Sequence, residues 1–449
     1  MSTSLGYTEK KIPVHLIQNK PSLRRLDLCI FFILFALILF YQLQLASPLM
    51  LFIFKARYAL YAYLYLRIAI FYRLRLTQKQ LLLFTFLLYA VFVTSHTYFL
   101  YGSQVALAGF TRFVNVALIA PIASILFKRI NESKIFVYFW LLVVWLGSLT
   151  LVYQLLGGEL SWLVRDYIAI RGSLIRFKSL LGEPNIGGMA SSIIYAFAIL
   201  AIRSFAVQIA LLVVALIFLV FSLSKAAMAG WIIATVIILL LKLTKKKYTL
   251  KLKKNIINKY TIILIFFLLL FVFSVTYPSA VQEYFVKYGQ TALIAFTGGD
   301  TGEGTAYSVL EDLSMRMIGI TQQGISLAME KSSFYPLNFL VGSSFGLAGS
   351  AALELKEDAL LPHNTFSEIY FVGGFFMLLL FLLILTKTLF ALWLRRTVNH
   401  YYQALFVTFF VIVAFMPSYP IIYEPILGSL FWLIVGLVAN SCLSIKNIV

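Results

Sequence analysis

Repeated apolar runs of roughly 20 residues, the length that an α-helix needs to cross a bilayer, constrain this chain more than any other feature of its sequence. The strands of a membrane β-barrel alternate over about 10 residues instead. The chain is 61% hydrophobic and only 12% charged, whereas soluble domains are about 45–50% apolar and 25% charged. We therefore predict an all-α, polytopic membrane protein.

The apolar runs predict about twelve transmembrane helices. The runs cover residues 28–46, 49–72, 81–101, 105–127, 135–156, 186–202, 205–223, 226–241, 260–277, 369–390, 401–416 and 426–441. Two loops are sizeable, 157–184 and 278–362, and they interrupt a bundle that extends over 28–441. A basic tail, 1–27, precedes this bundle, and a short C-terminus, 442–449, follows it.

Lysines and arginines in the short loops set the orientation of the bundle. They follow the second, fourth, sixth, eighth and tenth runs, and the positive-inside rule places such residues in the cytoplasm. Both termini are then cytoplasmic, and the two sizeable loops lie outside. The tail has no small-residue cleavage site, so we do not expect a cleaved signal peptide. This topology accounts for much of the net charge of +20, so nucleic acid is not an expected partner.

The second run contains three cations, Lys55, Arg57 and Arg67. A cation inside a membrane span is costly unless it faces a polar cavity or extends to the interface. Arg67 lies near the cytoplasmic end of the run, and we expect its side chain to extend to the interface. Lys55 and Arg57 lie toward the outer side, where a functional role and a purely interfacial role are both open.

The first outer loop, 157–184, is rich in cations, although the positive-inside rule disfavours cations outside. They are Arg165, Arg171, Arg176 and Lys178. The orientation of the bundle does not account for these cations, whereas binding of an anion would. The loop ends in Gly182-Glu183-Pro184-Asn185, where proline starts a helix whose first N–H groups are either simply capped or face an anion.

Two further cations and a histidine complete the candidate site. Lys225 lies in the tight outer turn before the eighth run, where it either joins the site or extends to the interface. The second outer loop carries Arg316 within a helical pattern over 308–329. At the foot of the tenth run His363 precedes Asn364, and it is either the general base of a transferase or an interfacial residue that caps the helix.

The order of these motifs resembles the superfamily of Wzy-type O-antigen polymerases and O-antigen ligases, from residue 165 to about 390. The shared order is a basic outer loop ending in Gly-x-Pro-Asn, a Ser-x-cation turn, a Ser-x-Arg helix, a Val-Gly-x-x-x-Gly turn, and His-Asn before an apolar helix with Gly-Gly. By this resemblance the catalytic residues are His363 and Arg316, and the diphosphate-binding residues are Arg176, Arg171, Lys225 and Arg165. The family usually has Arg in place of Lys225, and Gly in place of Met377.

The resemblance implies a glycosyltransferase of the C-type membrane fold, at the outer face of the bacterial cytoplasmic (inner) membrane. As a polysaccharide polymerase it would join oligosaccharide repeat units carried on undecaprenyl diphosphate. Cations would stabilise the leaving diphosphate, and His363 would remove the proton of the acceptor hydroxyl. No metal and no cofactor is expected. The expected partners besides the carrier-linked oligosaccharide are membrane lipid and a chain-length regulator protein.

Two other functions are open. An O-antigen ligase would transfer finished polymer from the carrier lipid to lipid A-core. A lipid-linked oligosaccharide flippase would be a transporter, and transporters of this kind are expected to contain internal repeats. The sequence shows no repeat between its halves, and its longest outer loop lies in one half only. We therefore place polymerase first, ligase second and flippase third.

Overall fold

The structure is a computed structural model in which the described residues are almost all helical. It describes residues 21–40, 48–72, 76–101, 103–127, 129–156, 158, 168–171, 174–177, 179–222, 225–243, 299–300, 305–306, 340–342 and 364–440. Within this part, four helices are long and apolar enough to cross a membrane. They are Gln78–Phe99, Gly109–Leu126, Ile130–Gln154 and Thr365–Arg395.

The first six helices follow the first five expected runs. They are α1 (Pro21–Leu39), α2 (Pro48–Phe71), α3 (Gln78–Tyr101), α4 (Ser103–Ala117), α5 (Ile119–Leu126) and α6 (Ile130–Leu155). The fourth run forms two helices rather than one, interrupted at Leu118. Pro121 explains this break, because proline has no N–H to donate to the carbonyl of Ala117. Helix α1 begins at Pro21, so Asp27 lies inside a helix.

The remaining helices follow the later runs, except that run 260–277 lies outside the described residues. They are α7 (Pro184–Leu200), α8 (Phe205–Phe221), α9 (Lys225–Leu243), α16 (Thr365–Arg395), α17 (His400–Phe415), the 3₁₀ turn η3 (Ile421–Tyr423) and α18 (Pro425–Ala439). Two short antiparallel hairpins accompany them. They are β1 (Ile168–Arg171) with β2 (Leu174–Phe177), and β3 (Gly299–Asp300) with β4 (Thr305–Ala306).

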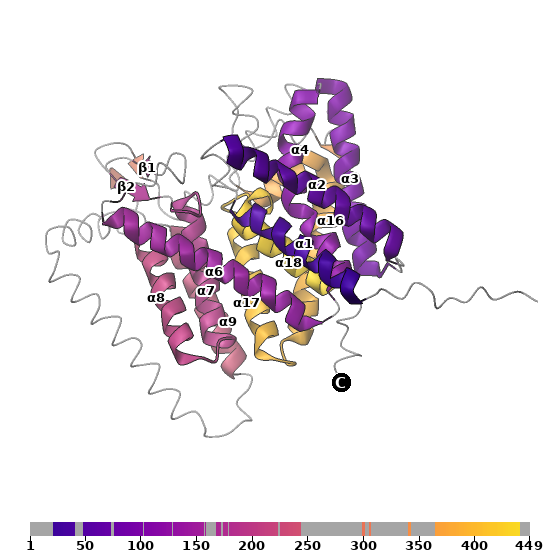
Figure 1. The fold of residues 1–449 in the computed structure, drawn as a ribbon. Coiled ribbons are helices and arrows are strands. Elements are labelled where there is room, and N and C mark those ends of the chain that lie inside the picture. The colour runs from indigo at the N-terminus through magenta and orange to yellow at the C-terminus, as the bar shows by residue number, and fades with distance from the viewer. Residues whose placement is uncertain are drawn as a thin grey trace, which may run out of the picture.

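Helix α18 forms the centre of the bundle, and helices from both halves of the chain pack around it (Figure 1). It is apolar on every side, as expected for a helix in a protein core, and its residues are buried along its length. Gly436 allows close approach to the backbone of Ala120 on α5, and a side chain at this position would overlap the carbonyl of Ala120. Beside this centre, α7, α8 and α9 form one group that packs on α17.

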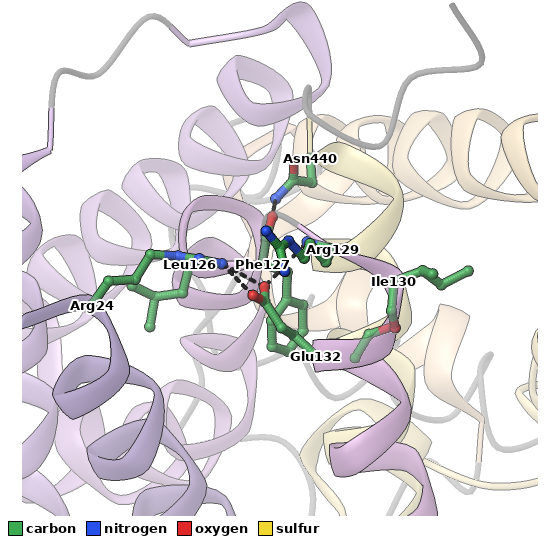
Figure 2. A network of polar contacts seen from close by, with 8 residues as sticks. Arg24, Leu126, Phe127, Arg129, Ile130, Glu132 and Asn440 are labelled. Atoms are coloured by element: carbon green, nitrogen blue, oxygen red, sulfur yellow. Dashed lines mark hydrogen bonds and ion pairs between the residues drawn. The ribbon is translucent and has the colours of Figure 1, made fainter. Parts of the chain in front are cut away.

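One end of the bundle is closed by ion pairs, and we call it the Arg24 end. Arg24 Nη2 on α1 lies 2.6 and 2.5 Å from the two carboxylate oxygens of Glu132 on α6. It also donates to the carbonyl of Leu126 at 3.2 Å, and the Asn440 amide donates to the carbonyl of Phe127 (Figure 2). Four helices, α1, α5, α6 and α18, are thereby joined where they end or begin.

A second ion pair at the same end joins α1 to α2. Arg67 Nε lies 3.1 Å from Asp27 Oδ1, and the Tyr72 hydroxyl donates to Asp27 Oδ2 at 2.9 Å. Asp27 is 1% exposed and the Arg67 side chain 13%. Arg67 therefore neutralises a buried carboxylate, whereas the sequence predicts that it extends to the interface.

Helix α16 is broken at Gly374, which adopts φ 64° and ψ −163°. The turn Leu340–Gly342 packs into this break, and Gly342 has φ 87°. A side chain on either glycine would overlap the backbone of the other segment, so only glycine fits at both positions. The Val-Gly turn and the Gly-Gly pair singled out in the sequence are therefore in direct contact.

Candidate functional site

The loop between α17 and α18 joins the starts of two other helices at the end opposite Arg24. Thr365, the first residue of α16, donates its N–H to the carbonyl of Met416 at 2.8 Å and its hydroxyl to the carbonyl of Tyr419 at 2.6 Å. The Tyr419 hydroxyl in turn donates to Glu183 Oε2, at the start of α7, at 2.7 Å. We call this region, with Glu183, Asn364, Tyr419 and the buried carboxyls nearby, the Glu183 end.

The end of α8 and the start of α9 also lie at the Glu183 end. Near the end of α8 the ring of Phe218 packs on Gly187, in the first turn of α7. Near the start of α9 Gly230 packs against Phe415, the last residue of α17. Lys225, the first residue of α9, is thereby brought to the same end as Glu183.

Side chains at the starts of α16 and α18 cap their own helices. Asn364 accepts from the N–H groups of Phe366 and Ser367, at 2.9 and 3.3 Å. Glu424 accepts from the N–H of Ile426 at 2.8 Å and also from that of Leu427. Such caps satisfy N–H groups that have no partner within the helix. Asn364 therefore supplies the capping contact that was one of the two roles open to His363.

Glu183 stands at the same position of α7, directly before a proline, but its side chain does not cap the helix. Its backbone carbonyl accepts from the N–H groups of Ile186 and Gly187 at 3.1 and 3.3 Å. Simple capping by the backbone is therefore the better of the two interpretations of this helix start. The exposed carboxylate beside it also disfavours an anion at this position.

Burial governs the protonation of the groups in the connecting loop. It raises the pKa of Glu424 to about 8, against the backbone N–H donors that favour the charged form and together with repulsion from Glu183. Burial and the neighbouring carboxylates Glu183 and Glu424 also raise the pKa of Tyr419 well above its ordinary value. The Tyr419 hydroxyl keeps its proton at neutral pH and remains a donor to Glu183.

Glu368, on the first turn of α16, is a buried carboxyl that the sequence places at the membrane entry. It is 6% exposed, and its Oε2 atom has no hydrogen-bond partner among the described residues. Arg112 on α4 is near enough to interact with it electrostatically. Ionisable residues within or beside a membrane span are candidates for a functional site. Arg112 was not among the predicted site residues, although a cation within an apolar run was the available signal.

The structure describes only part of the predicted site. His363, Arg316 and Arg165 lie outside the described residues, and so does the predicted helix 308–329. Arg171 and Arg176 lie on β1 and β2, where Arg171 pairs with Leu174 and Arg176 with Ala169. This register puts the two arginine positions on one face of the hairpin, because alternate strand residues share a face. Two strand-like runs separated by Gly-Ser are a hairpin signal that the all-α prediction missed.

The fold indicates a helical membrane protein with buried carboxyls at one end of its bundle. No family model, no curated protein and no solved structure matches the chain. In the part of the chain that the structure describes, no group of three or more His, Cys, Asp or Glu side chains could hold a metal ion.

Proposed function

We propose that the protein is a membrane-embedded polysaccharide polymerase, which joins oligosaccharide repeat units carried on undecaprenyl diphosphate. One observation carries the proposal. The Gly-x-Pro-Asn start of α7 and the His-Asn start of α16 are far apart in sequence, and both contact the loop that contains Tyr419. In the sequence, the arginine-bearing hairpin precedes α7 and Lys225 begins α9.

In the proposed reaction the acceptor sugar hydroxyl attacks the anomeric carbon of the donor glycan. The bond from that carbon to the diphosphate breaks, and the leaving oxygen takes the electron pair. Arg316, Arg171, Arg176 and Lys225 stabilise the diphosphate, since guanidinium groups donate two parallel hydrogen bonds to phosphate oxygens. His363 accepts the hydroxyl proton as the general base. The site faces the outside of the cytoplasmic membrane, with both termini inside.

The test is elongation by the purified protein with carrier-linked repeat units as the only substrate. We expect products that grow by whole repeat units, resolved on a gel, without added metal. Transfer that occurs only after lipid A-core is added would identify a ligase instead. Absence of any glycan transfer by the well-folded wild type would overturn the proposal.

After the ligase, a flippase is the remaining candidate, and the break in α16 favours it. Transporters commonly place a discontinuous helix at the substrate site, and α16 combines the Gly374 break with the buried carboxyl Glu368. In proteoliposomes a flippase would move labelled carrier-linked units between leaflets and leave their length unchanged. Elongation without such movement would exclude this candidate.

A further inference from the structure

We infer that the Glu183 carboxylate binds a hydroxyl of the acceptor sugar, and that Tyr419 positions Glu183 for this contact. The inference rests on the proposed function and deepens it, since it assigns the acceptor side of the site. None of the cations or the histidine predicted from the sequence performs this task.

The first step is that Glu183 stands at the capping position of α7, but its side chain does not cap the helix. The described helices α16, α17 and α18 begin with Asn364, Asn399 and Glu424, and each of these side chains accepts from N–H groups of its own helix. Glu183 begins α7 and does not. Its exposed carboxylate accepts from the Tyr419 hydroxyl instead.

The second step is that a hydrogen bond from the fixed Tyr419 side chain orients the Glu183 carboxylate. Tyr419 is fixed because its carbonyl accepts from the Thr365 hydroxyl at 2.6 Å, and the Ile421 N–H donates back to that hydroxyl at 3.0 Å. The Tyr419 hydroxyl uses only Oε2 of Glu183. A carboxylate has about four acceptor positions and no donor when ionised, so Glu183 keeps acceptor capacity for donors such as sugar hydroxyls.

The third step is a separate observation on Glu368. This neighbouring side chain is 6% exposed, and its Oε2 atom has no hydrogen-bond partner among the described residues. Glu183, Glu424 and Glu368 all act electrostatically on Tyr419, so each of these carboxyls lies near the Tyr419 ring. Buried polar atoms are normally hydrogen-bonded, and an unpartnered carboxyl oxygen here points to a bound polar group.

The fourth step concerns which substrate Glu183 binds, the donor diphosphate or the acceptor sugar. A diphosphate would be repelled by the Glu183 carboxylate, because like charges at short range disfavour each other. A neutral polyol offers hydroxyl donors without charge. The Glu183 end therefore contains a carboxylate-rich part that suits the acceptor sugar, and the predicted cations serve the donor diphosphate.

The kinetic test uses Glu183→Gln in the purified full-length protein, with a short-chain repeat-unit glycoside as acceptor and the carrier-linked unit as donor. We expect the acceptor KM to rise about 10-fold or more and the donor KM to stay within about 2-fold, because the variant loses binding energy for the acceptor alone. Tyr419→Phe should raise the acceptor KM by a smaller factor. Glu132→Gln, at the Arg24 end, is the matched control: it weakens the ion pair with Arg24, so it should lower Tm and leave the acceptor KM unchanged.

A second measurement does not depend on turnover. A water-soluble carbodiimide with glycine ethyl ester should label Glu183 in the folded protein and spare Glu424, and the glycoside should protect Glu183 from labelling. Unchanged acceptor KM in Glu183→Gln, with elongation by the wild type intact, would overturn the inference and leave the polymerase proposal standing. Labelling of Glu183 that the glycoside does not reduce would overturn it as well. Failure of wild-type elongation would strike the polymerase proposal instead.

Discussion

The Arg24 end and the Glu183 end of the bundle use carboxylates in opposite ways. At the Arg24 end Glu132 pairs with Arg24 and Asp27 pairs with Arg67, at 2.5 and 3.1 Å. At the Glu183 end the Glu183 side chain accepts from the Tyr419 hydroxyl, and the Glu424 side chain accepts from backbone N–H groups. Paired charges hold helices together, whereas the carboxyls at the Glu183 end form no ion pair with an arginine among the described residues and remain able to bind a ligand. On the proposed function, the Arg24 end stabilises the bundle and the Glu183 end forms part of the site.

The largest effect is expected at His363, the residue that precedes Asn364 in the sequence. His363→Ala should lower turnover by about 10²–10⁴-fold, the usual share of general base catalysis, and should leave donor binding nearly unchanged. His363→Gln should fail as well, because an amide cannot accept a proton at neutral pH. Elongation assays on purified variants, with folding checked by size exclusion, measure this. Wild-type elongation by His363→Gln would remove His363 from the role of base.

The next largest effect is a loss of stability expected at the Arg24 end. Asp27→Ala leaves Arg67 with no ion-pair partner in a place where its side chain is 13% exposed. Removing one partner of a buried pair typically costs about 3–5 kcal/mol, so Tm should fall by many degrees. The double variant Asp27→Leu, Arg67→Met should recover much of the loss. A Tm unchanged in Asp27→Ala would show that this end does not depend on its ion pairs.

A smaller effect concerns pH and Glu424. Its pKa is raised to about 8 when folded, against about 4.3 for an unperturbed glutamate, so the folded state binds the extra proton between these values. The stabilisation is complete below about pH 4.3 and is lost as pH rises through 8. The contribution of Glu424 should therefore lower the wild-type Tm by several degrees from pH 5 to pH 8. Glu424→Gln should show a weaker dependence, and an identical slope would contradict the assignment.

The smallest effect is expected from Asn364→Ala. Loss of an N-cap side chain costs about 1 kcal/mol, so Tm should fall by only a few degrees. Asn364→Asp should restore it, because aspartate caps as well as asparagine. A fall as large as that of Asp27→Ala would mean that Asn364 does more than cap α16.

The helices were predictable because each apolar run is local in the sequence. The described helices follow the expected runs, and the interruption at Leu118 has its cause nearby, in Pro121. Helix starts were less certain: α16 begins at Thr365 rather than near 369, since Asn364 supplies the cap. The His-Asn and Gly-x-Pro-Asn motifs were both recognisable as helix starts.

The contacts between those motifs were not predictable from the sequence. The hydrogen bond from Tyr419 to Glu183 joins residues 236 positions apart, and no periodicity encodes such a pair. Tyr419 itself carries no motif. Arg112 and Glu368 were visible as charges in or beside apolar runs, but their proximity depends on the packing of α4 near α16, which only the structure supplies.

The contact between Gly342 and Gly374 has a consequence for the length of the chain around it. Gly342 is anchored about ten helical residues along α16 from Asn364, which is roughly 15 Å. The stretch 343–363 joins these anchors, and a chain of about 20 residues reaches roughly 70 Å when extended. The contour length of 343–363 far exceeds the distance between the two anchors, and added residues raise the entropic cost of closing the loop only slowly. Insertions midway along 343–361 should therefore be tolerated, whereas any side chain at Gly342 or Gly374 should release the anchor.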